Sequence, residues 1–166
     1  MSQFQADSAM GLNQDIDVNS TTLQDTLGRT ITATDTASTA YGEGEFIYLQ
    51  GVASTAVGSV VTYQYGDYVT ALASANGVGL VAVAMSACVA GEYGWYQIRG
   101  LSVMKVLASF AADKLVYLTS TAGSVDDAVV VGDAIQPSYS FTAIDTPSTG
   151  LAEVSIDHPF VSNISN

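Results

Sequence analysis

From residue 41 onward the chain consists of short runs of β-favouring residues separated by glycine and small polar residues, and this spacing constrains the fold more than any other feature. Val, Ile, Thr, Tyr and Trp dominate the runs, and these residues fit pleated surfaces. The runs lie at 46–50, 59–65, 68–72, 80–85, 94–99, 101–107, 114–119, 128–131, 134–135 and 152–156. Strands at such spacing predict an all-β fold, a small barrel or sandwich of the β-clip or jelly-roll kind.

One stretch is also compatible with a helix. Residues 103–112 (VMKVLASFAA) contain Ala, Leu, Met and Lys, which are good helix formers. A strand that runs through Leu107, followed by a turn at 111–114, fits the neighbouring pattern better. Two segments that contain proline, Gln136-Pro137 and residues 146–150, are predicted as loops.

The first forty residues differ in texture from the rest of the chain. Ser, Thr, Gln, Asp and Asn dominate them, with isolated Leu and Ile. Such a segment can bury little apolar area to offset the entropy cost of ordering it. We therefore expect an extended polar N-terminal arm over 1–40, a β-rich domain over 41–161 and a tail over 162–166. We expect the arm to bind a partner by strand addition, so that deletion of residues 2–40 should leave a folded oligomer that no longer binds that partner.

Charge is scarce and strongly acidic. Only 12% of the residues are charged, about half of the roughly 25% that is usual for soluble domains. The net charge is −12, because the chain has 16 carboxylates and only four basic side chains, Arg29, Arg99, Lys105 and Lys114. Direct binding of nucleic acid is disfavoured by this field. A surface so poor in charge predicts that partner proteins cover part of it.

Two further features bear on location and redox chemistry. No apolar run approaches the length of a membrane span, and the N-terminus lacks the basic start and apolar centre of a secretory signal, so no membrane partner is expected. Cys88 is the only cysteine and lies in an apolar stretch. It is predicted to be a buried small hydrophobe rather than a nucleophile.

Residues that could carry catalysis are few. His158 is the only histidine, so a nucleophile–histidine unit or a zinc site has almost nothing to be built from. The carboxylate pairs 43/45 and 126/127 stand beside Gly and Ser, where solvated charges are usual. The G-x-G-x-x-A pattern in residues 76–82 opens onto a strand-like run, whereas a dinucleotide fingerprint needs a helix there. We expect no enzyme activity, metal or cofactor.

Several blocks, in this order, resemble the small head decoration (cement) proteins of tailed bacteriophages. The blocks are Gly44–Leu49, Gly58–Tyr63, Val81–Met85, Tyr93–Gly100 and the hairpin from Val116 to Val125. The run Glu-Tyr-Gly-Trp-Tyr-Gln-Ile at 92–98 is the most specific of them. The likeness covers residues 41–161 and is loose in the arm, around Leu27 and Arg29.

The resemblance implies a structural virion protein without catalysis. Such proteins bind the outer surface of the assembled head and bridge neighbouring major capsid proteins, so the chain would be made in the bacterial cytoplasm and end on the virion. Proteins of this kind commonly form trimers, and some related cement proteins form dimers. The resemblance therefore favours a homotrimer and leaves a homodimer open.

Contacts with another subunit or the capsid are expected from residues in these blocks and in the arm, namely Phe46, Tyr48, Tyr93, Trp95, Arg99, Leu27 and Arg29. In an alternating strand Trp95 and Arg99 share one face, so Arg99 could lie near an aromatic ring or pair with a neighbouring subunit's carboxylate. The alternative is that Trp95 merely covers one end of a barrel. A different function, a receptor- or glycan-binding β module of a head fibre or tail, is also open because exposed Tyr and Trp stack on sugars.

Overall fold

The computed structural model describes residues 4–6 and 12–163, and within them every regular element is a β-strand. The all-β prediction is therefore confirmed. None of the described residues forms a helix long and apolar enough to cross a membrane. The strands are β1 (Phe4–Ala6), β2 (Thr30–Asp35), β3 (Glu43–Gln50), β4 (Val60–Tyr63), β5 (Ala71–Leu72), β6 (Gly79–Ala84), β7 (Tyr93–Lys105), β8 (Tyr117–Leu118), β9 (Val125–Asp126), β10 (Gln136–Ser140) and β11 (Leu151–Val161).

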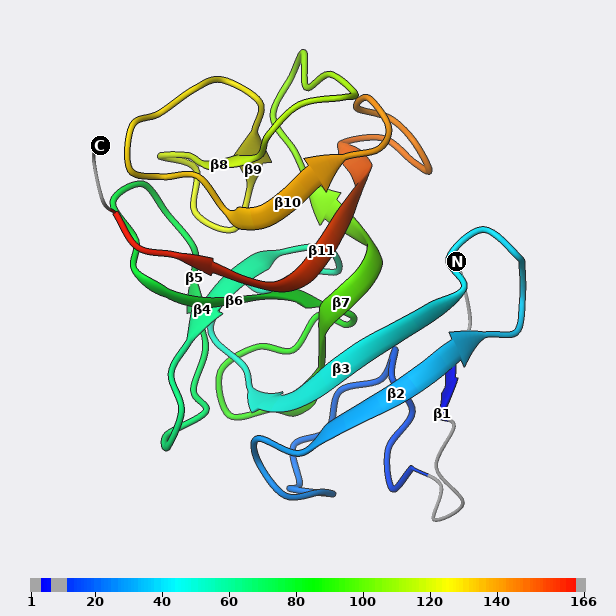
Figure 1. Cartoon of the computed structure of the whole chain (residues 1–166). Helices are drawn as coiled ribbons and strands as arrows, with labels where there is room; N and C mark the ends of the chain where they lie inside the picture. The colour runs from blue at the N-terminus through cyan, green and yellow to red at the C-terminus, as the bar shows by residue number, and fades with distance from the viewer. Residues whose placement is uncertain (1–3, 7–11, 164–166) are drawn as a thin grey trace.

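One large antiparallel sheet organises the molecule. Its strands follow the order β1-β2-β3-β7-β11-β6-β4-β5, and β10 pairs with the outer side of β11 (Figure 1). A separate small sheet joins β8 and β9. The long strand β7 pairs with β3 along its first half and with β11 along its second half, and it also touches β6. The sheet therefore bends around β7, which lies at the centre of the fold.

Glycine at position 100 allows β7 to pass from one partner to the other. Gly100 has φ +107°, a conformation that side-chain-bearing residues rarely adopt. A Cβ atom there would lie 2.9 Å from the carbonyl oxygen of Glu43 on β3. Because the two backbones approach so closely, the first half of β7 can stay beside β3 while the second half turns toward β11.

Strand β7 contributes to three buried clusters. Trp95 packs with Phe46 and Tyr48 on one face, and Tyr96 points into a second cluster on the other. Beyond Gly100, Met104 joins a third cluster beneath β11 and β6. The two-residue alternation predicted for residues 94–99 is present, but both faces are buried along this stretch.

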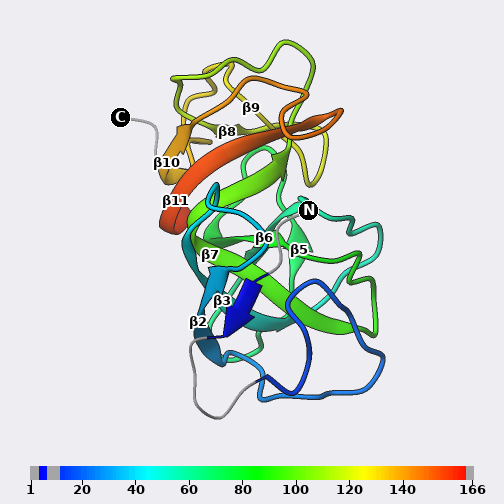
Figure 2. The ribbon, with the colours of Figure 1, turned by 90° about the vertical axis from the view of Figure 1, so that its right-hand side faces the viewer.

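The prediction of an extended arm is wrong for the described residues. Strand β2 pairs with β3 in the main sheet, and β1 pairs with β2. Ile16 and Ile31 are buried against the cluster that contains Trp95. The buried apolar residues of this segment are few, but they all meet one face of the sheet, whereas Val18 and Leu23 are exposed. In Figure 2 the blue segment passes along one side of β2, β3 and β7.

A single glutamine explains why so polar a segment can cover an aromatic cluster. Gln14 accepts a hydrogen bond from the Tyr48 hydroxyl at its Oε1 atom, 2.7 Å away, and its backbone oxygen accepts one from Trp95 Nε1 at 3.0 Å. Its Nε2 atom donates to the carbonyl oxygen of Tyr93 at 2.9 Å. The polar atoms of Tyr48 and Trp95 are thus satisfied inside the molecule, as buried polar groups require.

Several local predictions also changed. The run 128–131 is an exposed loop rather than a strand, and Gln136-Pro137 opens strand β10 instead of forming a loop. Pro137 lies at a register shift, where its missing N–H interrupts the ladder least. Over 103–112 the chain is a strand through Lys105 and then irregular, without a helix. Cys88 is buried, as predicted.

Candidate binding groove

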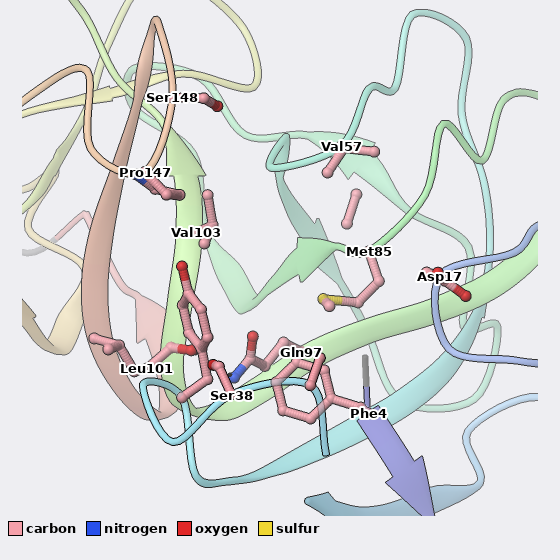
Figure 3. A pocket seen from close by; sticks show the side chains of 13 residues that line it. Phe4, Asp17, Ser38, Val57, Met85, Gln97, Leu101, Val103, Pro147 and Ser148 are labelled. Carbon is pink, nitrogen blue, oxygen red and sulfur yellow. Dashed lines mark hydrogen bonds between the residues drawn. The ribbon is translucent and has the colours of Figure 1, made fainter. Parts of the chain in front are cut away.

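An open groove with a volume of about 400 Å³ lies on the face of β7 beyond the covered aromatic cluster (Figure 3). Its wall draws on segments far apart in sequence, from β1 to the loop between β10 and β11. Apolar side chains dominate it, among them Phe4, Val57, Met85, Leu101, Val103 and Pro147. A hollow of this size and composition can hold an apolar group.

The floor of the groove comes from alternate residues of β7. Gln97, Leu101 and Val103 all line it. Gln97 is itself buried, and its Nε2 atom donates to the carbonyl oxygens of Arg99 and Leu101 at 3.1 and 3.2 Å. These bonds hold the irregular backbone on either side of Gly100. Gln97 therefore shapes the floor, and the apolar contact surface is left to Leu101 and Val103.

The rim carries a few polar groups. The hydroxyl of Tyr41 donates a hydrogen bond to Glu153 Oε1 at 2.8 Å. Burial, and then the hydrogen bond to Glu153, raise the pKa of Tyr41 above its ordinary value, so the hydroxyl stays protonated. Ser38 donates to Asp35, and Asp17 is the charged residue among those that line the groove. Among the residues that line the groove there is no paired nucleophile and base.

A cluster of ion pairs joins β3, β7 and β11 beside Gly100. Arg99 Nη2 lies 2.6 Å from Glu43 Oε1, and Arg99 Nε lies 3.5 Å from Glu45 Oε2. His158 Nε2 lies 3.2 Å from the same Glu45 oxygen, and its Nδ1 lies 2.9 Å from Asp157 Oδ1. The hydrogen bond with Asp157, followed by the one with Glu45, raises the pKa of His158. Arg99 is thus paired within its own chain.

Three residues predicted to contact a partner are instead part of the core. Phe46, Tyr48 and Trp95 have 0% of their surface exposed. The N-terminal segment covers them, so they offer no surface to another subunit or to a capsid. The interface prediction is wrong for these three side chains. The alternative, in which Trp95 merely covers one end of a barrel, does not describe it either, because Trp95 is itself a core residue.

The other predicted contact residues lie around that cluster. Tyr93 and Leu27 are half-buried against it. Arg29 pairs with Asp25 four residues earlier, and Arg99 joins the ion cluster described above. None of these four residues lines the groove. Most of the predicted contact residues therefore lie in one region. They form a covered aromatic cluster with polar residues around it.

Sequence reasoning missed the residues that do line the groove, notably Tyr41, Leu101 and Val103. The alternation of Leu101 and Val103 was visible, but Ser102 and Met104 alternate equally well, and the pattern does not say which set is covered. Which of the two sets is covered is decided only by the path of the N-terminal segment and of the loop that contains Pro147.

The described residues hold no group of three or more His, Cys, Asp or Glu side chains that could bind a metal ion. Comparisons with protein-family models, with curated proteins and with solved structures give no match. Fold and site together define an all-β protein that carries an open apolar groove.

Proposed function

We propose that this chain is a structural protein of a phage head, a decoration or cement protein that binds the outer surface of the capsid and stabilises contacts between major capsid proteins. The proposal includes no catalysis, no cofactor and no direct contact with nucleic acid or membrane. Its location would be the outer face of the virion.

The observation that carries the proposal is the apolar groove in a chain with so few charges. Leu101, Val103 and Met85 remain partly accessible in it. Accessible apolar surface of this kind is typical of a site for a protein partner. The motif blocks that resemble decoration proteins supply much of the surrounding sheet, including β3, β4, β6 and β7.

In this proposal an apolar side chain of the major capsid protein enters the groove, and the sheet acts as a rigid platform. Both faces of β7 are buried along its first half, so the platform changes little on binding. Attachment by a separate N-terminal arm is replaced by attachment through this groove, because the described part of the N-terminal segment belongs to the fold.

A binding experiment with purified heads tests the proposal. Heads that lack the chain would be mixed with the wild-type protein and with the groove variant Val103→Asp, and bound protein would be measured after sedimentation. We expect saturable binding of the wild type at a copy number that scales with the number of shell subunits, and loss of binding in the variant. Leu23→Asp, at an exposed leucine that does not line the groove, is the matched control and should bind normally. Absence of wild-type binding would reject the proposal.

A second function, a glycan-binding module of a head fibre or tail, is favoured by a different observation. Tyr65 is 73% exposed, and its ring makes edge-to-face contacts with Tyr63 and Tyr68, each at a centroid distance of 6.3 Å. An exposed aromatic ring held by its neighbours can stack on a sugar.

Stoichiometry and ligand binding separate the two functions. A decoration protein is present on a particle in numbers comparable with the shell subunit, whereas an adhesin is present in a few copies. Quantitative mass spectrometry of purified particles measures this ratio. Binding of the wild type to host surface polysaccharide, abolished in Tyr65→Ala, would favour the module instead.

A further inference from the structure

We infer that the groove accepts a tryptophan side chain of its partner, and that the indole N–H donates a hydrogen bond to Gln97 Oε1 on the groove floor. The inference deepens the proposed function and rests on it for the identity of the partner, because the anchor from the capsid would be a tryptophan rather than an aliphatic side chain. The binding chemistry itself depends only on the groove.

The orientation of the Gln97 amide is fixed by its nitrogen. Nε2 donates to the carbonyl oxygens of Arg99 and Leu101 at 3.1 and 3.2 Å, which uses both of its protons. The same nitrogen lies against the backbone at Gly44 and Gly100, where an added Cβ atom would approach it to 3.1 and 3.2 Å. Because the donor end of the amide is held by this backbone, the oxygen end is left to face the groove that Gln97 lines (Figure 3).

The oxygen of this amide is an unused hydrogen-bond acceptor. No described residue donates a hydrogen bond to Gln97 Oε1. Solvent still reaches this oxygen, although the residue as a whole is only 1% exposed. An apolar occupant would exclude water from the oxygen, and a buried acceptor without a donor is unfavourable. The occupant that binds best therefore brings a donor of its own.

Most other polar side chains of the groove also present acceptors. The Tyr41 hydroxyl already donates its proton to the carboxylate on β11 described above. The Ser38 hydroxyl donates to Asp35 Oδ2 at 2.7 Å, and Asp17 contributes a carboxylate. Ser148 is the exception, since its hydroxyl can donate, but this residue is exposed to solvent. A partner group that is only an acceptor would find little to bind in this lining.

The apolar wall favours an aromatic ring as the carrier of the donor. Phe4, Met85 and Pro147 are among the residues that surround the floor. Contacts of a ring with another aromatic side chain or with a thioether sulfur stabilise a complex beyond the burial of area alone. Indole combines a large apolar surface with an N–H that is a donor only. Phenylalanine lacks the donor, and a tyrosine hydroxyl would bring further acceptor lone pairs to a lining of acceptors.

An ionised anchor is disfavoured by the charges around the groove. None of the residues that line it is Lys or Arg, so a carboxylate or phosphate finds no counterion there. The net charge of −12 also repels an anion. A lysine or arginine side chain has donors, but the acceptor on the floor is the neutral amide of Gln97, which does not compensate a cation for its lost hydration. The indole N–H is neutral and avoids this cost.

An NMR titration of the full chain tests the donor directly. The probe is N-acetyl-tryptophanamide, and the comparison probe is the benzothienylalanine analogue, in which sulfur replaces the N–H of the ring. The wild type should bind the tryptophan probe with a dissociation constant of about 1 mM, with shift changes in the amide signals of Leu101 and Val103. The analogue should bind about tenfold more weakly, because it leaves Gln97 Oε1 without a donor.

A variant of the acceptor completes the test. Gln97→Met keeps the length of the side chain and removes its oxygen, so it should bind the two probes with similar affinities. Gln24→Met is the matched control, since Gln24 is exposed and does not line the groove, and it should keep the tenfold preference of the wild type. The amide spectrum of each variant shows whether it is folded. Should Gln97→Met not fold, the comparison of the two probes on the wild type decides.

The outcomes separate this inference from the proposed function. No binding of the tryptophan probe, equal affinities of the wild type for both probes, or a full preference in folded Gln97→Met would each overturn the inference. Binding to heads together with any of these results would retain the decoration function and reject the tryptophan anchor. A wild type that prefers the tryptophan probe but does not bind heads would support the groove chemistry and reject the capsid as its partner.

Discussion

The two halves of one face of β7 differ in how deeply their side chains are buried. Around Trp95 the face is covered by the N-terminal segment, which satisfies the indole nitrogen through Gln14 and leaves no exposed surface. Beyond Gly100, Leu101 and Val103 continue the same alternation but line an open groove. The comparison teaches that burial in this sheet depends on whether a distant segment crosses the strand, and that the uncovered half of the face stays accessible.

Removal of the covering segment should have the largest effect. Deletion of residues 2–40 takes away β2 and exposes Phe46, Tyr48 and Trp95. Three aromatic side chains at roughly 200 Å² each and about 25 cal/mol per Å² correspond to about 15 kcal/mol as an upper estimate. Because whole domains are stable by only about 5–15 kcal/mol, we expect no cooperative unfolding transition in circular dichroism or calorimetry. A truncated protein with a sharp transition near that of the wild type would show that the cover is dispensable.

Substitutions in the two halves should differ in their effect on stability. Trp95→Ala should lower the free energy of unfolding by about 3–5 kcal/mol, since it empties a fully buried site. Val103→Ala, at the half-exposed floor of the groove, should cost no more than about 1 kcal/mol. Urea denaturation of both variants measures this difference. Similar losses of unfolding free energy in the two variants would contradict the division of β7 into a covered half and an open half.

The polar cover of the aromatic cluster can be tested with a double-mutant cycle. Tyr48→Phe removes the hydroxyl that donates to Gln14, and Gln14→Ala removes its acceptor. Each single variant should destabilise the protein by about 1–3 kcal/mol, with Gln14→Ala the larger because it also removes the Nε2 donor to the carbonyl oxygens of Val18 and Tyr93. The coupling energy from equilibrium unfolding should be about 1 kcal/mol. Additive effects would indicate that the hydrogen bond does not hold the segment in place.

The ion cluster at the boundary of the two halves should give the smallest effect, visible as a pH dependence. The pKa of His158 is raised in the folded state above its ordinary value of 6.5 by Asp157 and Glu45. The folded state therefore binds the proton more tightly, and this contribution is complete below pH 6.5 and lost as the pH rises through the folded-state pKa.

Because the His158 side chain is 53% exposed, the contribution should be below about 1 kcal/mol and should shrink in high salt. His158→Gln should remove the decline in unfolding free energy above pH 6.5 that the wild type shows. The measurement is chemical denaturation at a series of pH values. A variant that keeps the full decline would assign it to another group.

Strand content could be predicted from the sequence because it depends on local composition. The runs at 46–50, 80–85 and 94–99 became parts of β3, β6 and β7, since β-branched and aromatic side chains pack well on a pleated surface. The prediction of a strand at 128–131 is wrong although this run has a similar composition, because none of the described strands pairs with it. Local preference selects candidate strands, and pairing decides among them.

The N-terminal segment and the groove could not be predicted in this way. Residues 12–35 have a composition typical of an unfolded chain, and their order comes from contacts with residues far along the sequence, such as the bonds from Gln14 to Tyr48 and Tyr93.

By itself the sequence determined the all-β class, the burial of Cys88, the acidic charge and the alternation along β7. Only the tertiary structure decided which side of that alternation is covered, that Arg99 pairs within its own chain, and where the groove lies. The physical reason is that side-chain direction in a strand follows from neighbouring backbone geometry, whereas burial follows from long-range packing that no local pattern encodes.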